Sequence, residues 1–182
     1  MVKQKIIEKL IPIVCNKGYS EMSISCISEA TGLKKSSIYH FFANGKSQIA
    51  LEIIQFVQNL LSESFTEIMN SGDLPFRTLH KALDVLSEFY GAGKRNCLID
   101  VMTIGNTDHK MQEASGGLAY KLIDIFKTIL ISADLDAKNA EKKSIEIVTL
   151  LQGSLVLSRA THNNQFFVNC IRSLKREYPV IP

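Results

Sequence analysis

The chain has 182 residues, which suits one domain or a small module joined to a larger one, and 46% of them are hydrophobic. This composition is too apolar for a disordered chain, and four prolines and ten glycines are too few for a turn-rich all-β fold. The 21 Lys and Arg against 18 Asp and Glu give a formal net charge of only +3. At first sight, so small a charge disfavours a nucleic-acid-binding protein.

Nothing in the sequence predicts export, a membrane span or a metal site. Charges interrupt the apolar positions at the N-terminus, so no signal peptide is expected. The most apolar stretches, residues 122–131 and 145–157, fall short of the roughly 18 apolar residues that a membrane span needs. The four cysteines are widely separated and form no Cys-x-x-Cys pair. We therefore expect a cytoplasmic protein without metal or cofactor.

The first expected helix runs from Lys3 to Asn16, where apolar residues recur at helical spacing. Gly18 follows it as a residue that can take a positive φ and end the helix. Pro12 cannot donate a backbone hydrogen bond, and we expect it to bend the helix.

Two short helices are expected next, over residues 23–30 and 34–42, with Gly32 between them. Ser23 is the expected N-cap of the first, because its hydroxyl can accept a hydrogen bond from the first turn. A long amphipathic helix is then expected to begin near Lys46.

The remainder of the chain is also expected to be helical. The further helical segments are Leu74–Tyr90, Cys97–Gly105, His109–Ile131, Ala137–Thr161 and Asn164–Glu177. No segment shows strand-like alternation over more than a few residues. The sequence thus predicts an all-α fold of about nine helices, with a three-helix head over residues 1–45 joined to a larger helical bundle over residues 46–182.

Residues 24–42 have the spacing of a helix-turn-helix. If Ile38 and Phe42 face the core, the polar residues of the second helix are left to face outward. These residues are Lys34, Lys35, Ser36, Ser37, Tyr39 and His40. Their ammonium, hydroxyl and imidazole groups suit phosphates and base edges of DNA. Composition alone leaves open the alternative of an ordinary solvated helix face.

The run from Gly18 to Leu33, followed by residues 38–42 and Lys46, resembles the N-terminal domain of the TetR family of transcriptional regulators. That family has a Gly-aromatic pair after its first helix, a glycine turn, a Leu-Tyr-x-x-Phe pattern in its third helix and a lysine at the start of its fourth. The set covers about 45 residues. The rest of the chain is similar only in its helix lengths and in residues 150–157.

The resemblance implies that residues 1–45 form a helix-turn-helix DNA-binding domain and residues 46–182 a ligand-binding and dimerisation domain. It also implies that residues 34–40 form a recognition helix lying in the major groove. Tyr39 and Lys46 match positions that usually contact phosphates. Ser23 and Ser25 would offer hydroxyl and backbone N–H groups at a helix start, which favours anions in any case.

Some positions depart from the family pattern. Met22 replaces a usual Thr, Ser28 a usual Ala, Ser36 a frequent Gly and Ala43 a frequent Pro. Ser36 and Ser37 match positions near the base edges, where the family varies with its operators. The departures therefore bear on sequence preference more than on whether DNA is bound.

The C-terminal segment 145–157 is apolar almost all round, which is typical of a helix buried on several sides. In the resemblance, the last two helices form a four-helix interface with a second copy. The expected interface residues are Leu151, Leu155, Phe166, Phe167, Ile171 and Leu174. The alternative is that these side chains simply close the core of the monomer.

Aromatic residues and methionines at helical spacing in the body are more often core than pocket. The resemblance favours an apolar inducer cavity among them. The expected ligand-binding residues are Phe89, Met102, Phe126, Gln152 and Arg159. An enzyme is disfavoured, because the sequence has no Gly-x-Ser-x-Gly, no His-Glu-x-x-His and no Gly-rich phosphate loop.

The sequence as a whole favours a homodimeric repressor that binds a palindromic DNA operator and is released by a small apolar inducer. The alternatives are a dimeric regulator with a protein partner in place of the inducer and, less favoured, an all-helical enzyme. The charge distribution supports DNA binding. Residues 1–48 hold seven lysines and three glutamates, a net of +4, whereas residues 49–182 hold 14 basic and 15 acidic residues, a net of −1.

Overall fold

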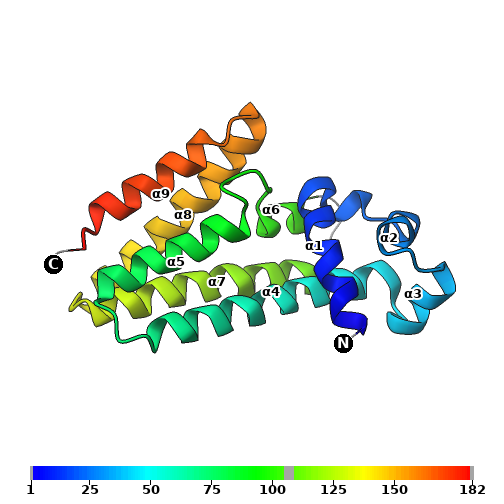
Figure 1. Ribbon diagram of the computed structural model, residues 1–182, viewed down its shortest axis with the longest axis horizontal. Coiled ribbons are helices and arrows are strands. Elements are labelled where there is room, and N and C mark those ends of the chain that lie inside the picture. The colour runs from blue at the N-terminus through cyan, green and yellow to red at the C-terminus, as the bar shows by residue number, and fades with distance from the viewer. Residues whose placement is uncertain (1, 105–108, 181–182) are drawn as a thin grey trace. The chain divides into compact units, whose positions relative to one another are not determined.

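The computed structural model describes residues 2–104 and 109–180, and within these ranges the chain is all-helical (Figure 1). Its helices are α1 (Val2–Glu21), α2 (Ile24–Thr31), α3 (Lys35–Phe41), α4 (Gly45–Met69), α5 (Pro75–Phe89), α6 (Leu98–Thr103), α7 (His109–Ser132), α8 (Ala137–Thr161) and α9 (Gln165–Glu177). The predicted all-α class and the count of nine are confirmed for the part of the chain that is described. Gly105, the expected end of one helical segment, lies outside the described residues.

Capping side chains and glycines set the helix ends in the N-terminal region. The Ser23 hydroxyl oxygen accepts a hydrogen bond of 3.1 Å from the Cys26 backbone N–H, which confirms the predicted cap of α2. Gly32 ends α2 with a φ of +72°, and its N–H donates to the Ser28 carbonyl at 2.9 Å. A side-chain cap at Ser23 and a glycine cap at Gly32 therefore define the two ends of α2.

Helix α8 begins at a carboxylate cap. Asp136 Oδ1 accepts hydrogen bonds of 3.1 Å from the backbone N–H groups of Lys138 and Asn139. The Asn139 backbone N–H and side chain hold the pKa of Asp136 below its ordinary value. The cap therefore remains ionised and fixes the start of the helix.

The break in α1 falls at Gly18 rather than at Pro12. Gly18 has a φ of +78° and a ψ of 167°, the non-helical angles of this helix, whereas the helix continues through Pro12. Pro12 and Glu8 both lie at the exposed surface, where water can hydrogen-bond the Glu8 carbonyl that a proline leaves unpaired. The predicted positive φ at Gly18 is confirmed, and the predicted bend at Pro12 stays a prediction.

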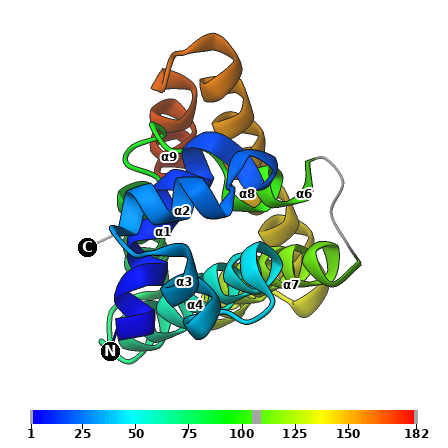
Figure 2. The same cartoon turned by 90° about the vertical axis from the view of Figure 1, so that its right-hand side faces the viewer.

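The chain divides into two compact units, whose boundaries pass through α4 and α7. The first comprises Met1–Asn59 and Leu98–Leu118, and the second Leu60–Cys97 and Ala119–Pro182. In the first unit α1 packs against α2 and α6, and α2 packs against α3 (Figure 2). In the second, α9 packs against α8 and α5. The predicted division at residue 45 concerns roles rather than packing, and it stays a prediction.

Each unit has its own apolar core. In the first, Met22, Ile27, Ile38 and Phe42 are fully buried. Met22, which replaces the Thr usual in the family that the N-terminal region resembles, is therefore a core residue. The fully buried side chains of the second unit include Leu83, Phe126 and Phe167. In the first unit, the buried side chains of α2 and α3 leave the polar residues of these helices at the surface.

Candidate nucleic-acid interface

The start of α2 is an exposed, electropositive helix end. Ser23 and Ser25 are both exposed, and the Ser23 O–H stays available as a donor because only its oxygen is used by the cap. Lys17 Nζ lies 3.6 Å from Cys26 Sγ in the first turn of α2, which places an ammonium beside the same helix end. The sequence reasoning missed Lys17, although its place just before the Gly18 break indicates that it lies near α2. Together these groups suit a phosphate oxygen.

Helix α3 turns its polar residues outward. Lys34, Lys35, Ser36, Tyr39 and His40 are exposed, and Ser37 is half-buried. Ile38 on this helix and Phe42 at its C-cap are fully buried, as the sequence predicts. Five of the six expected contact residues on this helix are thus available to a ligand in solvent, and their roles on DNA stay predictions.

Three hydrogen bonds lock the turn between α2 and α3. The Ser28 hydroxyl donates to the Leu33 carbonyl at 2.6 Å. The Thr31 hydroxyl donates to the Ile27 carbonyl at 2.7 Å and accepts from the Leu33 N–H at 3.3 Å. Ser28, a departure from the usual Ala, therefore has a structural role: it ties the second helix to the end of the turn and so fixes the placement of α3.

Tyr39 and Lys46 lie where α3 leads into α4. A Cβ added to Gly45 would be 3.2 Å from Tyr39 Cε1, so the tyrosine ring rests against the glycine, whose φ is +58°. Lys46 Nζ donates to the Ser20 carbonyl at 3.0 Å and lies 4.2 Å from the centroid of the Tyr19 ring. The Lys46 ammonium is therefore engaged by the end of α1, while Tyr39 remains half exposed.

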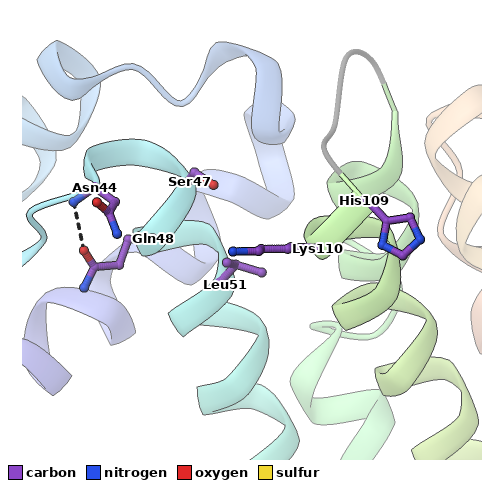
Figure 3. A pocket seen from close by; sticks show the side chains of 6 residues that line it. All are labelled: Asn44, Ser47, Gln48, Leu51, His109 and Lys110. Atoms are coloured by element: carbon purple, nitrogen blue, oxygen red, sulfur yellow. Dashed lines mark hydrogen bonds between the residues drawn. The ribbon is translucent and has the colours of Figure 1, made fainter.

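A polar hollow of about 500 Å³ lies in the first unit between the N-terminal turns of α4 and α7 (Figure 3). It is lined by Asn44, Ser47, Gln48, Leu51, His109 and Lys110. Gln48 Oε1 accepts a hydrogen bond of 3.0 Å from the Asn44 N–H, and Lys110 extends from α7 toward Leu51. Five of the six lining residues carry polar groups and none of the six is acidic.

Comparison with known proteins places this arrangement in a recognised fold. No protein-family model matches the chain. An HTH-type transcriptional regulator from the lacX 3′ region of Lactococcus lactis subsp. lactis is 23% identical over 172 residues, 88% of this chain and 85% of its own length. The HTH-type transcriptional regulator YxaF of Bacillus subtilis is 19% identical over 160 residues, 86% and 84% of the two chains. A TetR transcriptional regulator from Legionella pneumophila superposes with a TM-score of 0.88 over 97% of both chains, at 18% identity. The chain has the TetR fold.

In this TetR fold, α8 and α9 lie side by side (Figure 1), and most of the expected dimer residues are buried. Of the expected interface residues, Leu151, Leu155, Phe167, Ile171 and Leu174 are buried within the single chain, and only Phe166 is exposed. These five side chains pack within the protomer, Leu174 also lines the surface groove between α8 and α9, and their role in a dimer interface stays a prediction. Because α8 is apolar almost all round, its sequence does not show which side contacts α9.

Apart from Phe166, the exposed apolar residues of α8 and α9 are not among the expected interface residues. Leu150, Leu157 and Phe166 line a groove of about 420 Å³ between α8 and α9, with Gly153 between the two leucines. Cys170 lines the groove as well, and burial raises the pKa of its thiol, which keeps it neutral. Of these side chains, the sequence identified only Phe166 as an interface residue, because α8 is apolar almost all round and its spacing does not distinguish Leu150 and Leu157 from the buried leucines.

The expected ligand-binding residues have varied environments. Met102 in the first unit and Phe126 in the second are fully buried, whereas Phe89, Gln152 and Arg159 in the second unit are half-buried. Gln152 accepts a hydrogen bond from the Cys97 thiol. None of the five lines the polar hollow or the α8–α9 groove. An inducer site built from them stays a prediction.

Two further features bear on the function classes. Within residues 2–104 and 109–180, no three His, Cys, Asp or Glu side chains come together so as to hold a metal ion. In the same ranges, no helix combines the length and the hydrophobicity that crossing a bilayer demands.

Proposed function

We propose that the chain is a DNA-binding transcriptional regulator of the TetR family. The observation that carries the proposal is the surface of α3, which buries Ile38 and Phe42 and exposes a row of DNA-compatible side chains. The similarity to HTH-type regulators along most of the chain supports it. A role on DNA places the protein in the cytoplasm and gives no reason to expect catalysis.

On DNA, α3 enters the major groove and the start of α2 faces the backbone. Lys34 and Lys35 neutralise phosphates, and Ser36, Ser37 and His40 lie toward the base edges. The Tyr39 hydroxyl donates to a phosphate oxygen. At the start of α2, Ser23 and Ser25 bind a second phosphate, with Lys17 supplying the positive charge beside it.

The regulator acts as a homodimer on a palindromic operator, because one helix-turn-helix reads only a few base pairs and two heads must reach major grooves roughly 34–36 Å apart. The α8–α9 groove is the proposed contact. A second copy would cover Leu150, Leu157 and Phe166 with the same residues of its own, as a two-fold interface requires. Gly153 would permit close approach of the helices.

We further propose that DNA binding represses transcription and that a small apolar inducer reverses it. An inducer that fits one arrangement of the two heads better than another lowers operator affinity by its own preference between the two. The half-buried Phe89, Gln152 and Arg159 are the candidate inducer contacts in the second unit.

Selection of genomic fragments bound by the purified protein, followed by sequencing, tests the proposal. The expected result is enrichment of a palindrome whose half-sites lie about one helical turn apart. Failure to enrich any duplex, together with no binding to mixed-sequence DNA at low salt, would overturn it.

Two variants at Ser23 separate capping from phosphate contact. Ser23→Asp keeps an N-cap acceptor but puts a negative charge near the phosphate, so we expect roughly tenfold weaker DNA binding with unchanged thermal stability. Ser23→Ala loses the cap, at about 1 kcal/mol, but adds no charge. Fluorescence anisotropy and thermal denaturation measure the two effects. Wild-type affinity in Ser23→Asp would show that the start of α2 does not face the backbone.

A further inference from the structure

Lys46, the second residue of α4, directs its ammonium into the protein. Its Nζ donates a hydrogen bond of 3.0 Å to the Ser20 carbonyl and lies 4.2 Å from the centroid of the Tyr19 ring. Both partners follow the Gly18 break, at the very end of α1. A carbonyl oxygen and an aromatic face both attract a cation, so the two contacts hold the ammonium at one place.

The partners of Lys46 continue directly into α2. The Met22 N–H donates to the Tyr19 carbonyl at 3.2 Å, and the Ser23 N–H donates to the Glu21 carbonyl at 2.9 Å. Tyr19 and Ser20 therefore lie at the end of α1, where the short connection to Ser23, the cap of α2, begins. Displacing this connection displaces the start of α2.

Along the chain, Lys46 lies in the first turn of α4, directly after the connection that follows α3. The Gly45 N–H donates to the Phe42 carbonyl at 2.8 Å, so the start of α4 is tied to the end of α3. One ammonium thus joins the segment before α2 to the segment after α3, 26 residues apart. This contact therefore links the segments that flank the helix-turn-helix on its two sides.

The environment of the ammonium fits this internal role. Lys46 is half-buried, and burial lowers its pKa from the ordinary value. Partial removal of water strengthens the contacts that the charge makes with the carbonyl and the ring. Lys34 and Lys35, by contrast, are exposed at the start of α3.

We propose that Lys46 is a positioning residue, which fixes α2 and α3 relative to each other through Tyr19 and Ser20 instead of contacting a phosphate itself. This assignment differs from the phosphate contact that the resemblance implies for Lys46. It rests on the proposed function for its effect on DNA, whereas the contact itself can be measured without DNA.

A matched set of variants tests the assignment. Lys46→Met removes the charge, and Tyr19→Leu removes the ring but leaves the charge in place. Tyr19→Phe keeps the ring face, and Lys46→Arg keeps a cation that can stack on it. The probes are the duplex recovered by fragment selection and a mixed-sequence duplex, with affinity measured by fluorescence anisotropy over a series of salt concentrations.

If Lys46 acts through Tyr19, Lys46→Met and Tyr19→Leu both weaken binding to the selected duplex by roughly tenfold. The double variant is no weaker than either single one, because both remove the same contact. The salt dependence keeps its wild-type slope, and Tyr19→Phe and Lys46→Arg bind like the wild type. A slope lowered by about one per protomer in Lys46→Met, with wild-type affinity in Tyr19→Leu, would overturn the assignment and establish a phosphate contact.

Proton NMR of the free protein supplies a readout that does not depend on DNA. Protons over the face of a ring resonate upfield, so the Lys46 ε-methylene signal is expected upfield in the wild type and in Tyr19→Phe, and at its ordinary place in Tyr19→Leu. A wild-type signal at its ordinary place would overturn the proposal. If the wild-type protein binds no duplex, the proposed function fails, and the NMR signal still decides whether Lys46 holds Tyr19.

Discussion

The helix pairs α2–α3 and α8–α9 each turn a face to solvent, but the two faces differ in chemistry. The outer face of α3 consists of polar and charged groups, among them Lys35, Ser36 and His40, and its apolar Ile38 and Phe42 are buried. On the α8–α9 pair, Leu150 and Phe166 face outward with 52% and 42% of their surface exposed. Both pairs bury apolar side chains within the protomer, but only the α8–α9 pair also leaves leucine and phenylalanine side chains exposed.

The difference indicates what each face is suited to meet. A polar face is stable in water, so it can bind and release a polar partner such as DNA without a large cost in either state. An exposed apolar face gains about 25 cal/mol for each Å² that a partner covers. A continuous apolar groove therefore favours a stable interface with a partner, and a second copy of the chain would provide one. The comparison predicts opposite responses to substitution at neighbouring residues of α9.

The largest effect is expected from Phe167→Ala. Phe167 is fully buried, its ring lies 6.0 Å from that of Tyr90 between centroids, and a Cβ on Gly93 would come within 2.7 Å of its own Cβ. Removing the ring from so tight a site leaves a cavity, and the free energy of unfolding should fall by about 3–5 kcal/mol. Urea denaturation followed by circular dichroism measures the loss.

Phe166→Ala is the matched control, one residue away on the same helix. Since the side chain is 42% exposed, its loss should change the stability of the protomer little and weaken the dimer instead. Denaturation at a series of protein concentrations separates the two, because only dimer stability depends on concentration. Equal, concentration-independent losses in both variants would show that the two sides of α9 are assigned wrongly.

The sequence was most informative where side-chain chemistry and helix punctuation agree. In the head, Ser23, Gly32 and the buried pair Ile38 and Phe42 identify the elements and their inner faces, because a cap, a positive φ and an apolar spacing each have one simple reading. The roles of the outward residues on DNA, however, came from the resemblance and from chemical type.

In α8 the sequence could not show which face is inside. Leu150, Leu151, Leu155 and Leu157 are chemically equivalent, and only the tertiary packing of α8 distinguishes the middle two, which are buried, from the outer two, which are exposed. The internal engagement of Lys46 was equally out of reach, since it depends on a tertiary contact with a carbonyl 26 residues away. Residues whose environment is set by a neighbouring helix are those that a single-chain pattern leaves undecided.

The next effect in size concerns the groove. Leu150→Asp should dissociate the dimer at micromolar concentration, because a carboxylate in an apolar contact loses its water without gaining a partner. Losing the second head should lower operator affinity roughly a hundredfold, the usual gain from linking two sites. Sedimentation velocity and anisotropy measure the two effects.

Tyr120→Asp is the control for a charge placed on another exposed apolar residue of the second unit. Tyr120 lies on α7 with 75% of its surface exposed. The Tyr120→Asp substitution should leave both the oligomeric state and the affinity for DNA unchanged. A dimer that survives Leu150→Asp would move the interface away from the α8–α9 groove and remove the main difference between the two helix pairs.

The smallest effect tests why the head keeps its shape. Gly32 ends α2 with a φ of +72°, and a Cβ there would meet no atom within 4 Å, so any cost of Gly32→Ala comes from the backbone conformation alone. An alanine in the left-handed region costs about 1–2 kcal/mol. Gly116, in the same compact unit, is helical and also has open space around it, so Gly116→Ala should stabilise the protein by about 0.5–1 kcal/mol. Thermal denaturation of the two variants should therefore shift in opposite directions. DNA affinity should fall only in Gly32→Ala, because the turn that this glycine permits also carries the Ser28–Leu33 hydrogen bond that places α3.

Stabilisation of the protein by both alanines would contradict this account. It would mean that residue 32 can relax to a negative φ. The placement of α3 would then depend on the contacts at its two ends, those of Lys46 included, rather than on the turn.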